Sequence, residues 1–335
     1  MARPTNPSLQ DIADAAGVSK MTVSRVLRGG KGFSDETEIR VRREAERLGY
    51  LPNKLAAAFG PRGSSTLIGV CVPRLNSSLF GVLLETLNAT LGRFGYQTMI
   101  GVHDERPTEE ETWLRTLAAW KPAGVILVGH DHSGGTRGIL RDMGVPVAEI
   151  WDLTTAPIDL AVGFSHGDAG QEMARCVAGA GHARVGYVGA LADRRSMGQN
   201  RLDGFRRGLD EFGLELFGCE ILEDRPGFYQ GYYGTETLFG RVRDLDAVYY
   251  HNDEMAIGGM AWFERQGMRV PEEVAVAGFG GMEAASILRR RLTTTAVPAV
   301  RIARLSAEVL VQRLRGEPVE DVSLIPTVLV RGATV

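Results

Sequence analysis

The residues best suited to acid–base or metal chemistry form two short runs, each directly after an apolar stretch. They are His103–Asp104 and His130–Asp131–His132. Two imidazoles one residue apart can hold a metal ion or exchange protons, but a metal site needs further ligands, and no helix-borne third ligand accompanies this pattern. The sequence also lacks a nucleophile elbow, a Walker loop and a G-x-G-x-x-G motif. We therefore expect these side chains to hydrogen-bond a ligand, and we expect no enzymatic activity, metal or cofactor.

A wider set of polar residues lies just beyond the apolar runs of the chain. Ligands of open α/β sheets bind beyond the carboxyl ends of the strands, so such residues should converge on a small-molecule cleft. Two alternatives stay open: some of the arginines form internal ion pairs, and Asp253 caps a helix that starts at Glu254. The candidate ligand-binding residues are Arg74, Asn76, Asp104, His130, Asp152, His166, Arg195, Arg201, Asn252 and Asp253.

The scaffold that must position these residues is predicted by hydrophobic pattern. From Thr66 onward, short continuous apolar runs alternate with helical stretches, which is typical of parallel strands covered on both faces. Two sets of such βα units, divided near Phe164, predict two doubly wound lobes with a cleft between them. A strand near Leu292 is expected to return the chain to the first lobe. The expected strands are 66–72, 96–102, 124–129, 145–150, 160–164, 184–189, 246–250 and 274–279, and the glycines expected to end helices in the left-handed conformation are Gly95, Gly144, Gly181, Gly213 and Gly267.

The first fifty residues predict a different unit. Ser8 is placed to cap one helix, Gly17 to end it, and Ser19 to cap a second helix that begins at Lys20; a third helix runs from Ser34 to Leu48. Two short helices joined by a tight glycine turn form a helix-turn-helix, whose second helix enters the major groove of DNA. A helical hairpin that binds a protein partner is the alternative. The candidate DNA contacts in this unit are Ser19, Lys20, Met21, Thr22, Ser24 and Arg25.

The distribution of charge agrees with a nucleic-acid partner for the first unit alone. The net charge of the chain is -3, yet residues 1–64 carry 11 Lys/Arg against 7 Asp/Glu, while residues 65–335 carry 27 against 34. A basic head on an acidic body suggests that a polyanion binds the head. Charged residues interrupt every apolar run, the N-terminus lacks an apolar signal core, and three scattered cysteines fit a reducing compartment. We expect a cytoplasmic protein that does not bind membranes.

Many separated motifs of the chain closely resemble the LacI/GalR family of repressors. They include "SKMTVSRVLRGG", "IGVCVPRLNSSLFG", "HNDEMAIGGM" and "VPEEVAVAGF", and they extend over almost the entire chain. "KMTVSR", "GYQTM", "IDLAVGF" and the Gly after "AGF" resemble the gluconate-operon branch. The resemblance implies that Arg201 grips the effector, with Arg195 as a second contact, and that Asn252–Asp253 match a cleft loop of the family.

The resemblance also implies a hinge helix that enters the minor groove and inserts an apolar wedge between bases. Asn53, Ala56 and Phe59 are the candidate contacts, with Phe59 at the position of the family's leucine. Packing of Phe59 against the body is the alternative. Ala57 and Ala58 stand where the family usually has Arg-Ser, which is expected to remove phosphate or groove contacts.

These observations together predict an α/β fold with an N-terminal three-helix head and a two-lobed periplasmic-binding-protein-like effector domain. The expected parts are 1–50 (helix-turn-helix domain), 51–65 (hinge helix and linker) and 66–335 (effector binding and dimerisation), with lobe 1 about 66–164 and 294–324 and lobe 2 about 165–293 and 325–335.

The expected function is that of a homodimeric repressor that binds a palindromic DNA operator and is released by a small-molecule effector. Sugar-sensing relatives have Asp where Gly280 stands, and loss of that carboxylate near several arginines favours an anionic sugar acid such as gluconate. A co-repressor-dependent regulator, or a regulator of another sugar or sugar-acid pathway, is the alternative. A solute-binding protein without regulatory function is disfavoured by the attached DNA-binding head.

Overall fold

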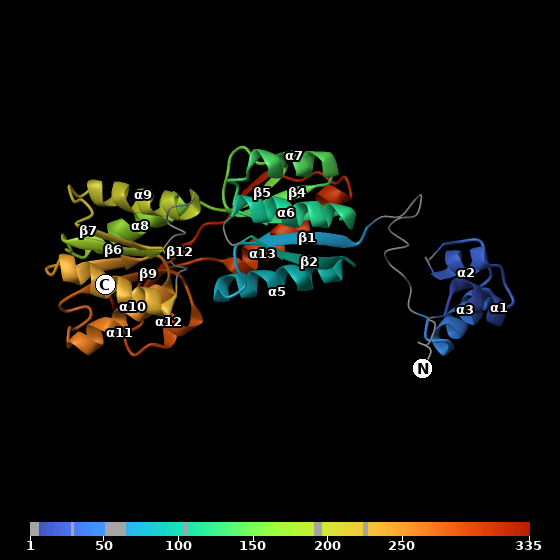
Figure 1. Ribbon diagram of the computed structural model, residues 1–335, viewed down its shortest axis with the longest axis horizontal. Helices are drawn as coiled ribbons and strands as arrows, with labels where there is room; N and C mark the ends of the chain where they lie inside the picture. The colour runs from blue at the N-terminus through green and yellow to red at the C-terminus, as the bar shows by residue number, and fades with distance from the viewer. Residues whose placement is uncertain (1–6, 28–29, 51–64, 104–105, 191–195, 224–226) are drawn as a thin grey trace. The chain divides into compact units, whose positions relative to one another are not determined.

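The computed structural model describes residues 7–27, 30–50, 65–103, 106–190, 196–223 and 227–335, and the chain separates into two compact units, 1–65 and 66–335 (Figure 1). The first unit holds three helices, α1 (Leu9–Ala16), α2 (Lys20–Leu27) and α3 (Asp35–Arg47). They enclose a small core in which Ile12, Val23 and Val41 are fully buried. This arrangement is the expected helix-turn-helix unit.

The helix ends of the first unit follow the predicted signals. Ser8 and Asp11 form a capping box at the start of α1, and Gly17 ends that helix with φ +64°. The Ser19 hydroxyl accepts a hydrogen bond from the Thr22 amide at 3.1 Å, and Ser34 caps α3 in the same way. The caps predicted at Ser8, Gly17 and Ser19 are confirmed, because these signals depend only on neighbouring residues.

The second unit contains two six-stranded sheets that form its two lobes. The first sheet has the order β2-β1-β3-β4-β5-β11 with all neighbours parallel; the second has the order β7-β6-β8-β9-β10-β12, parallel except for the β10–β12 pair. The strands are β1 (Leu67–Val72), β2 (Gln97–Val102), β3 (Gly124–Val128), β4 (Val147–Asp152), β5 (Leu160–Phe164), β6 (Val185–Ala190), β7 (Gly218–Leu222), β8 (Ala247–Tyr250), β9 (Ala275–Gly280), β10 (Thr293–Ala296), β11 (Val322–Leu324) and β12 (Val328–Val330).

Helices cover both faces of each sheet, as continuous apolar strands require. In the first lobe α5 and α13 lie on one face and α6 and α7 on the other; in the second lobe α8 and α9 lie opposite α10 and α11 (Figure 1). These helices are α5 (Ser78–Arg93), α6 (Pro107–Ala119), α7 (Gly134–Met143), α8 (His166–Gly179), α9 (Ser196–Asp210), α10 (Phe228–Arg241), α11 (Asp253–Gln266), α12 (Glu283–Ile287) and α13 (Ala299–Leu314). All five glycines predicted to end helices have positive φ, between 59° and 97°.

The course of the chain between the lobes differs from the expectation at one place. The strand near Leu292 was expected to return the chain to the first lobe, but β10 pairs with β9 of the second sheet, and the expected lobe boundary at 294 falls inside it. The return comes after Ala296, with α13, which packs on α5. β7 and the short β11 and β12 lie at sheet edges and are not among the expected strands.

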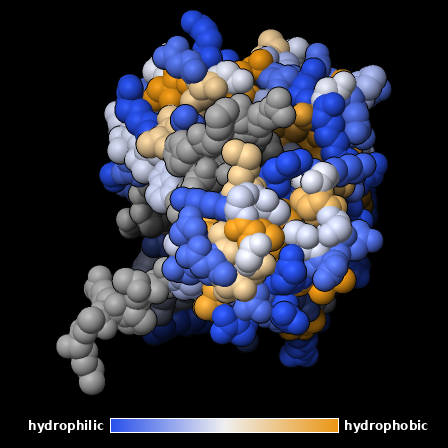
Figure 2. Space-filling model, turned by 90° about the vertical axis from the view of Figure 1, so that its right-hand side faces the viewer, coloured by the Kyte–Doolittle hydropathy of each residue, from blue (hydrophilic) through white to orange (hydrophobic). Residues whose placement is uncertain are grey.

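No described helix is long and apolar enough to cross a bilayer. The face shown in Figure 2 is predominantly hydrophilic, with apolar side chains scattered among polar ones, a distribution that is ordinary for a protein surface.

Candidate ligand cleft and helix-turn-helix face

A cleft of about 170 Å³ lies between the lobes of the second unit, beyond the carboxyl ends of the strands. This is the position at which open α/β sheets bind ligands. Both lobes contribute charged, aromatic and imidazole side chains to it. From the first lobe come Arg74, Asn76, Phe80, His103, Glu110, Asp131, His132 and Trp151, and from the second His166, Met197, Arg201, His251, Asn252, Glu254 and Phe279.

Arg201, on α9, organises the second-lobe wall of the cleft. Its side chain is only 3% exposed. One terminal nitrogen donates to His166 Nδ1 at 3.1 Å; the other contacts His251 Nδ1 at 3.0 Å and the His251 carbonyl at 2.9 Å. The guanidinium also lies 4.0 Å over the Phe279 ring, a cation–π arrangement. Imidazoles, a carbonyl and an aromatic face therefore hold the guanidinium in one orientation.

His166 begins α8 and is held as a neutral imidazole. Burial lowers the pKa of His166 to about 3; the Arg201 charge acts in the same direction, while Asp152 opposes it. Because Nδ1 accepts from Arg201, the ring proton of the neutral form lies on Nε2. Nε2 is buried without a hydrogen-bond partner in the described part of the chain. The second-lobe wall thus has the Arg201 guanidinium at Nδ1 of the His166 ring and an unsatisfied N–H donor at Nε2, on the other side of the ring.

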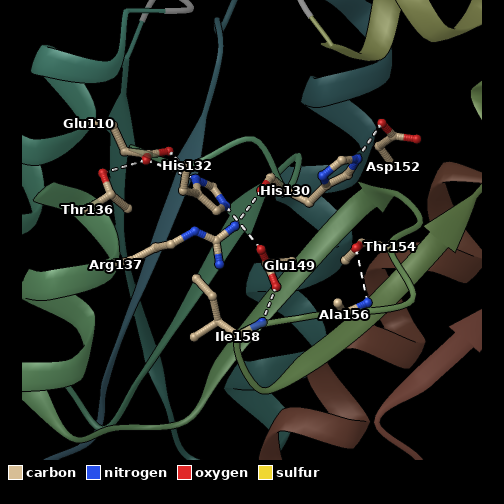
Figure 3. Close-up of polar contacts among 10 residues, drawn as sticks. All are labelled: Glu110, His130, His132, Thr136, Arg137, Glu149, Asp152, Thr154, Ala156 and Ile158. Carbon is tan, nitrogen blue, oxygen red and sulfur yellow. Dashed lines mark hydrogen bonds and ion pairs between the residues drawn. The ribbon is translucent and has the colours of Figure 1, made fainter. Parts of the chain in front are cut away.

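A buried acidic network underlies the first-lobe wall (Figure 3). The Glu110 carboxylate, on α6, contacts His132 Nδ1 at 2.9 and 3.1 Å and accepts from the Thr136 hydroxyl at 2.9 Å. Burial acts to raise the pKa of Glu110, but the bonds from His132 and Thr136 outweigh it, and the pKa is lowered. On the other side of the ring, His132 Nε2 lies 3.6 Å from Glu149, whose pKa is raised by burial.

A second imidazole–carboxylate pair lies where the lobes meet. His130 Nε2 lies 3.1 Å from Asp152, at the end of β4 (Figure 3). The hydrogen bond to Asp152 raises the pKa of His130, and the same pair lowers the pKa of Asp152 against the effect of burial. Asn200, on α9 of the second lobe, also reaches Asp152, at 3.5 Å. Asp152 therefore joins the lobes and does not line the cleft itself.

Asn252 and Asp253 serve different purposes at the start of α11. The Asn252 side chain accepts from the Met255 amide at 2.9 Å and so caps the helix, while Asp253 is its first residue. Asp253 accepts instead from the Thr294 hydroxyl and the Met282 amide, at 2.5 and 2.6 Å, and is 2% exposed. The alternative that Asp253 caps a helix starting at Glu254 is wrong, because the helix starts one residue earlier and the carboxylate ties down the segment after β9.

Gly280 occupies a position where a side chain would be costly. Its φ is +132°, and a Cβ placed on it would lie 3.0 Å from Leu79 of the first lobe and 3.6 Å from an Asp253 oxygen. A carboxylate at position 280 would therefore stand beside the buried Asp253 carboxylate. Leu79 takes the space instead, as one contact between the lobes.

Aromatic rings line the floor of the cleft and continue from one lobe to the other. Trp151 packs against Phe80 at 5.1 Å and against Phe164 at 5.8 Å, and Phe164 lies 6.1 Å from Phe279. Trp151 has φ +85°, a strained value for a bulky residue. Its strand partner Gly163 permits this backbone, since a Cβ there would lie 2.7 Å from the Trp151 carbonyl oxygen.

The structure places the candidate ligand-binding residues in three groups. Arg74, Asn76, His166, Arg201 and Asn252 line the cleft. His130, Asp152 and Asp253 stand behind it in the contacts described above. Asp104 and Arg195 lie outside the described residues. Among the described residues Arg201 pairs with two imidazoles. The charge of Arg74 acts on Glu254, whose pKa is raised chiefly by burial.

Two cleft residues of evident importance are absent from the candidates. Glu110 sits inside α6 and not beyond a strand, and its partner Thr136 is 26 residues away. His251 directly precedes the expected Asn252, so its position just beyond a strand was a usable signal. Among the described residues no cluster of His, Cys, Asp and Glu has the arrangement of a metal site.

On the first unit, the candidate DNA contacts lie on α2 and its cap. Lys20, Met21 and Arg25 are exposed, and Met21 is 73% exposed despite its apolar side chain. Ser19 and Thr22 bond each other, at 2.9 Å. Arg25 donates to the Lys31 carbonyl, and the absence of a side chain at Gly32 leaves room for the guanidinium. Asn53, Ala56 and Phe59 lie outside the described residues.

Comparison with known proteins follows the same division of the chain. Residues 8–53 match the model of bacterial regulatory proteins of the lacI family, and residues 174–335 match a periplasmic binding protein-like domain. The HTH-type transcriptional regulator GntR of Escherichia coli K12 is 31% identical over 93% of both chains. The GntR of Pseudomonas aeruginosa is 34% identical over 95% of this chain and 92% of its own.

Solved structures have the same fold over most of the chain. A LacI-family transcriptional regulator from Silicibacter pomeroyi superposes with a TM-score of 0.91 at 35% identity and covers 98% of this chain and 99% of its own. GntR from Chromobacterium violaceum has a TM-score of 0.76 at 29% identity and covers 80% of this chain and 98% of its own.

Proposed function

This chain belongs to the LacI family of bacterial regulatory proteins, which are ligand-responsive DNA-binding transcription regulators and not enzymes, and we propose that it is a repressor released from its operator by a sugar acid such as gluconate. The residues that line the cleft favour a sugar acid over a neutral sugar, and the sequence motifs that resemble the gluconate-operon branch favour gluconate among the sugar acids. In this proposal the protein acts in the cytoplasm.

The observation that carries the sugar-acid proposal is the buried guanidinium of Arg201, which lines the cleft together with the neutral ring of His166. A ligand carboxylate in the cleft would meet this cation in a fixed orientation, which favours charge-assisted hydrogen bonds. Gly280 adds to this, since the carboxylate that would repel an acid is missing and Leu79 fills the space. Hydroxyl groups of the ligand would bond polar residues of both lobes, and aromatic floor residues would pack on its carbon chain.

We propose that the operator is read by a homodimer. A helix-turn-helix unit reads one half-site, so a palindromic operator needs two copies related by a two-fold axis. Large apolar side chains suited to subunit contact are exposed on the second lobe, on α10 and α12. They are Phe228, Tyr229, Tyr233 and Ile287, with exposed fractions of 48%, 75%, 54% and 79%.

Control of DNA binding follows from linkage. The ligand shifts operator affinity only by the difference between its affinities for the DNA-bound and free arrangements of the lobes. Asn200–Asp152 and Leu79–Gly280 are contacts that a change in lobe angle would alter. Release by the ligand is the direction we propose; a co-repressor, which strengthens operator binding, is the second candidate.

A gel-shift titration on the DNA upstream of the protein's own gene tests the proposal. Gluconate should weaken operator binding by about 5- to 150-fold, the usual range of allosteric coupling, while glucose should have no effect. Tighter operator binding with gluconate would establish the co-repressor alternative. A response to glucose but not to any sugar acid would overturn the choice of ligand.

A further inference from the structure

Glu110 is a buried carboxylate in the wall of the cleft. It is 5% exposed and lines the cleft from the first lobe, whereas Arg201 lines it from the second. Burying an ionised group is costly unless bonds compensate for the lost water. Here His132 and Thr136 provide those bonds, and they hold the pKa of Glu110 below its ordinary value. The carboxylate is therefore ionised in neutral solution.

The His132 imidazole, which contacts Glu110, also lies close to a second carboxylate. His132 lies between Glu110, 2.9 Å from Nδ1, and Glu149, 3.6 Å from Nε2. Glu149 is completely buried and accepts from the Ile158 amide at 2.5 Å (Figure 3). His132 thus has a fixed ring orientation, and Glu110 is presented to the cleft as a positioned acceptor.

The bonds to Glu110 leave part of its acceptor capacity free for a ligand. Oε1 accepts from both His132 and Thr136, while within the described part of the chain Oε2 has only the longer contact to His132, at 3.1 Å. An ionised carboxylate has about four acceptor sites and no donor. A ligand hydroxyl can donate to Oε2, whereas a ligand carboxylate can only repel it.

We propose that Glu110 determines specificity by accepting a hydroxyl group of the effector and by excluding a second carboxylate from the first-lobe end of the cleft. The inference rests on the proposed function, because it assumes that the acid group of the effector binds at Arg201. The cleft then selects polyhydroxy acids with one carboxylate over diacids of the same chain length. Asp131, an exposed neighbour of His132 in the same wall, adds to the negative charge at that end.

The test compares three six-carbon ligands by calorimetry on the full chain: gluconate with one carboxylate, glucarate with two and glucitol with none. The wild type should bind gluconate most tightly. Glu110→Gln keeps the size of the side chain and removes its charge, so the Kd of gluconate should rise while the Kd of glucarate falls. We expect the ratio of the glucarate Kd to the gluconate Kd to fall by about tenfold or more.

The matched control is Glu111→Gln, the same change at the next residue of α6. Glu111 accepts from the Ser133 hydroxyl and does not line the cleft, so the Kd ratio should stay at the wild-type value. If Glu110→Gln fails to fold in a thermal unfolding assay, Thr136→Val replaces it; loss of one bond to Glu110 should lower the ratio in the same direction by a smaller factor.

The outcomes separate the two proposals. If wild-type protein binds gluconate and a folded Glu110→Gln variant leaves the Kd ratio unchanged, the specificity role of Glu110 is overturned and the sugar-acid effector stands. If wild-type protein binds glucitol as well as gluconate and glucarate, or binds no acid, the proposed effector class fails and the role of Glu110 fails with it.

Discussion

Arg201 is the residue through which two imidazoles of the cleft acquire a fixed orientation. Each of its terminal nitrogens contacts an Nδ1 atom, of His166 and of His251. A planar guanidinium with donors in a fixed fork can hold two partners at once, which a lysine ammonium on a flexible stem does less well. Loss of Arg201 should therefore remove its charge and release both rings.

We expect Arg201→Ala to weaken gluconate binding by about tenfold or more, since charge-assisted hydrogen bonds are lost. Operator binding without effector should remain near the wild-type value, because the reading helix lies in the separate unit of residues 1–65. Calorimetry and gel shift measure the two quantities. Arg206→Ala is the control, an exposed arginine of α9 paired with Asp203; a normal gluconate response of Arg201→Ala would show that the cleft is wrongly assigned.

His166 predicts a specific loss of stability in acid. Burial lowers its pKa to about 3, so between pH 6.5 and 3 the unfolded chain binds a proton that the folded chain excludes. Stability then falls as pH decreases below 6.5, by about 1.4 kcal/mol per pH unit for one group. In His166→Asn, the drop in the free energy of unfolding between pH 7 and pH 5 should be about 2 kcal/mol smaller than in wild type, as measured by urea unfolding.

His130 provides a comparison for His166, because folding raises the pKa of His130 and lowers that of His166. The bond to Asp152 raises its folded-state pKa, so its contribution to stability is complete below the unfolded value and disappears as pH rises through the raised one. His130→Asn should cost about 1 kcal/mol or less at pH 6 and almost nothing at pH 9. Equal acid sensitivity of wild type and His166→Asn would mean that His166 takes up a proton in the folded state.

At the level of helices, close contact between α8 and α9 sets the register of the second-lobe wall. A Cβ on Gly170 of α8 would lie 2.0 Å from the Arg201 carbonyl oxygen, and a Cβ on Gly204 of α9 would lie 2.0 Å from that of Gly167. The two backbones therefore approach as closely as only glycine allows. Because His166 begins α8 and Arg201 lies on α9, this approach also determines the geometry of the cleft.

Gly170→Ala should push α8 and α9 apart, since the added methyl meets backbone atoms that have no rotamer to change. We expect a loss of about 1–3 kcal/mol in the free energy of unfolding, together with weaker gluconate binding. Gly179→Ala in the same helix is the control: nothing lies within 4 Å of its Cβ, and it should be neutral or stabilise by up to about 1 kcal/mol. Urea unfolding and calorimetry with gluconate measure these quantities for both variants. A Gly170→Ala variant with wild-type stability and wild-type gluconate affinity would contradict this account.

The elements predicted correctly from the sequence are those whose signals are local. Ser8 and Gly17 identify the ends of α1 through contacts within a few residues, and continuous apolar runs identify β1 and β3. β10 was placed in the wrong lobe because pairing with β9 depends on residues far along the chain. Glu110 was missed for the same reason: its role requires His132 and Thr136, and only the fold brings α6 beside the loop that begins α7.

At the scale of the whole molecule, the effector unit consists of two lobes, and the chain passes from one lobe to the other three times. The lobes are joined after Phe164, after Ala296 and between Leu324 and Val328, and each joint lies beside the cleft-forming ends of the sheets. This unit has its own cores, and the described residues that line the cleft all lie within 66–335.

Removal of residues 1–65 should therefore separate the two activities. The 66–335 fragment should bind gluconate within about threefold of the full chain, because every cleft residue is retained, and gluconate should raise its unfolding temperature by mass action. It should no longer shift operator DNA, because Lys20, Met21 and Arg25 are gone, whereas the full chain should bind operator and lose affinity steeply with added salt. A folded fragment that fails to bind gluconate would mean that the head completes the ligand site, and a fragment that still shifts operator would place DNA recognition on the acidic body.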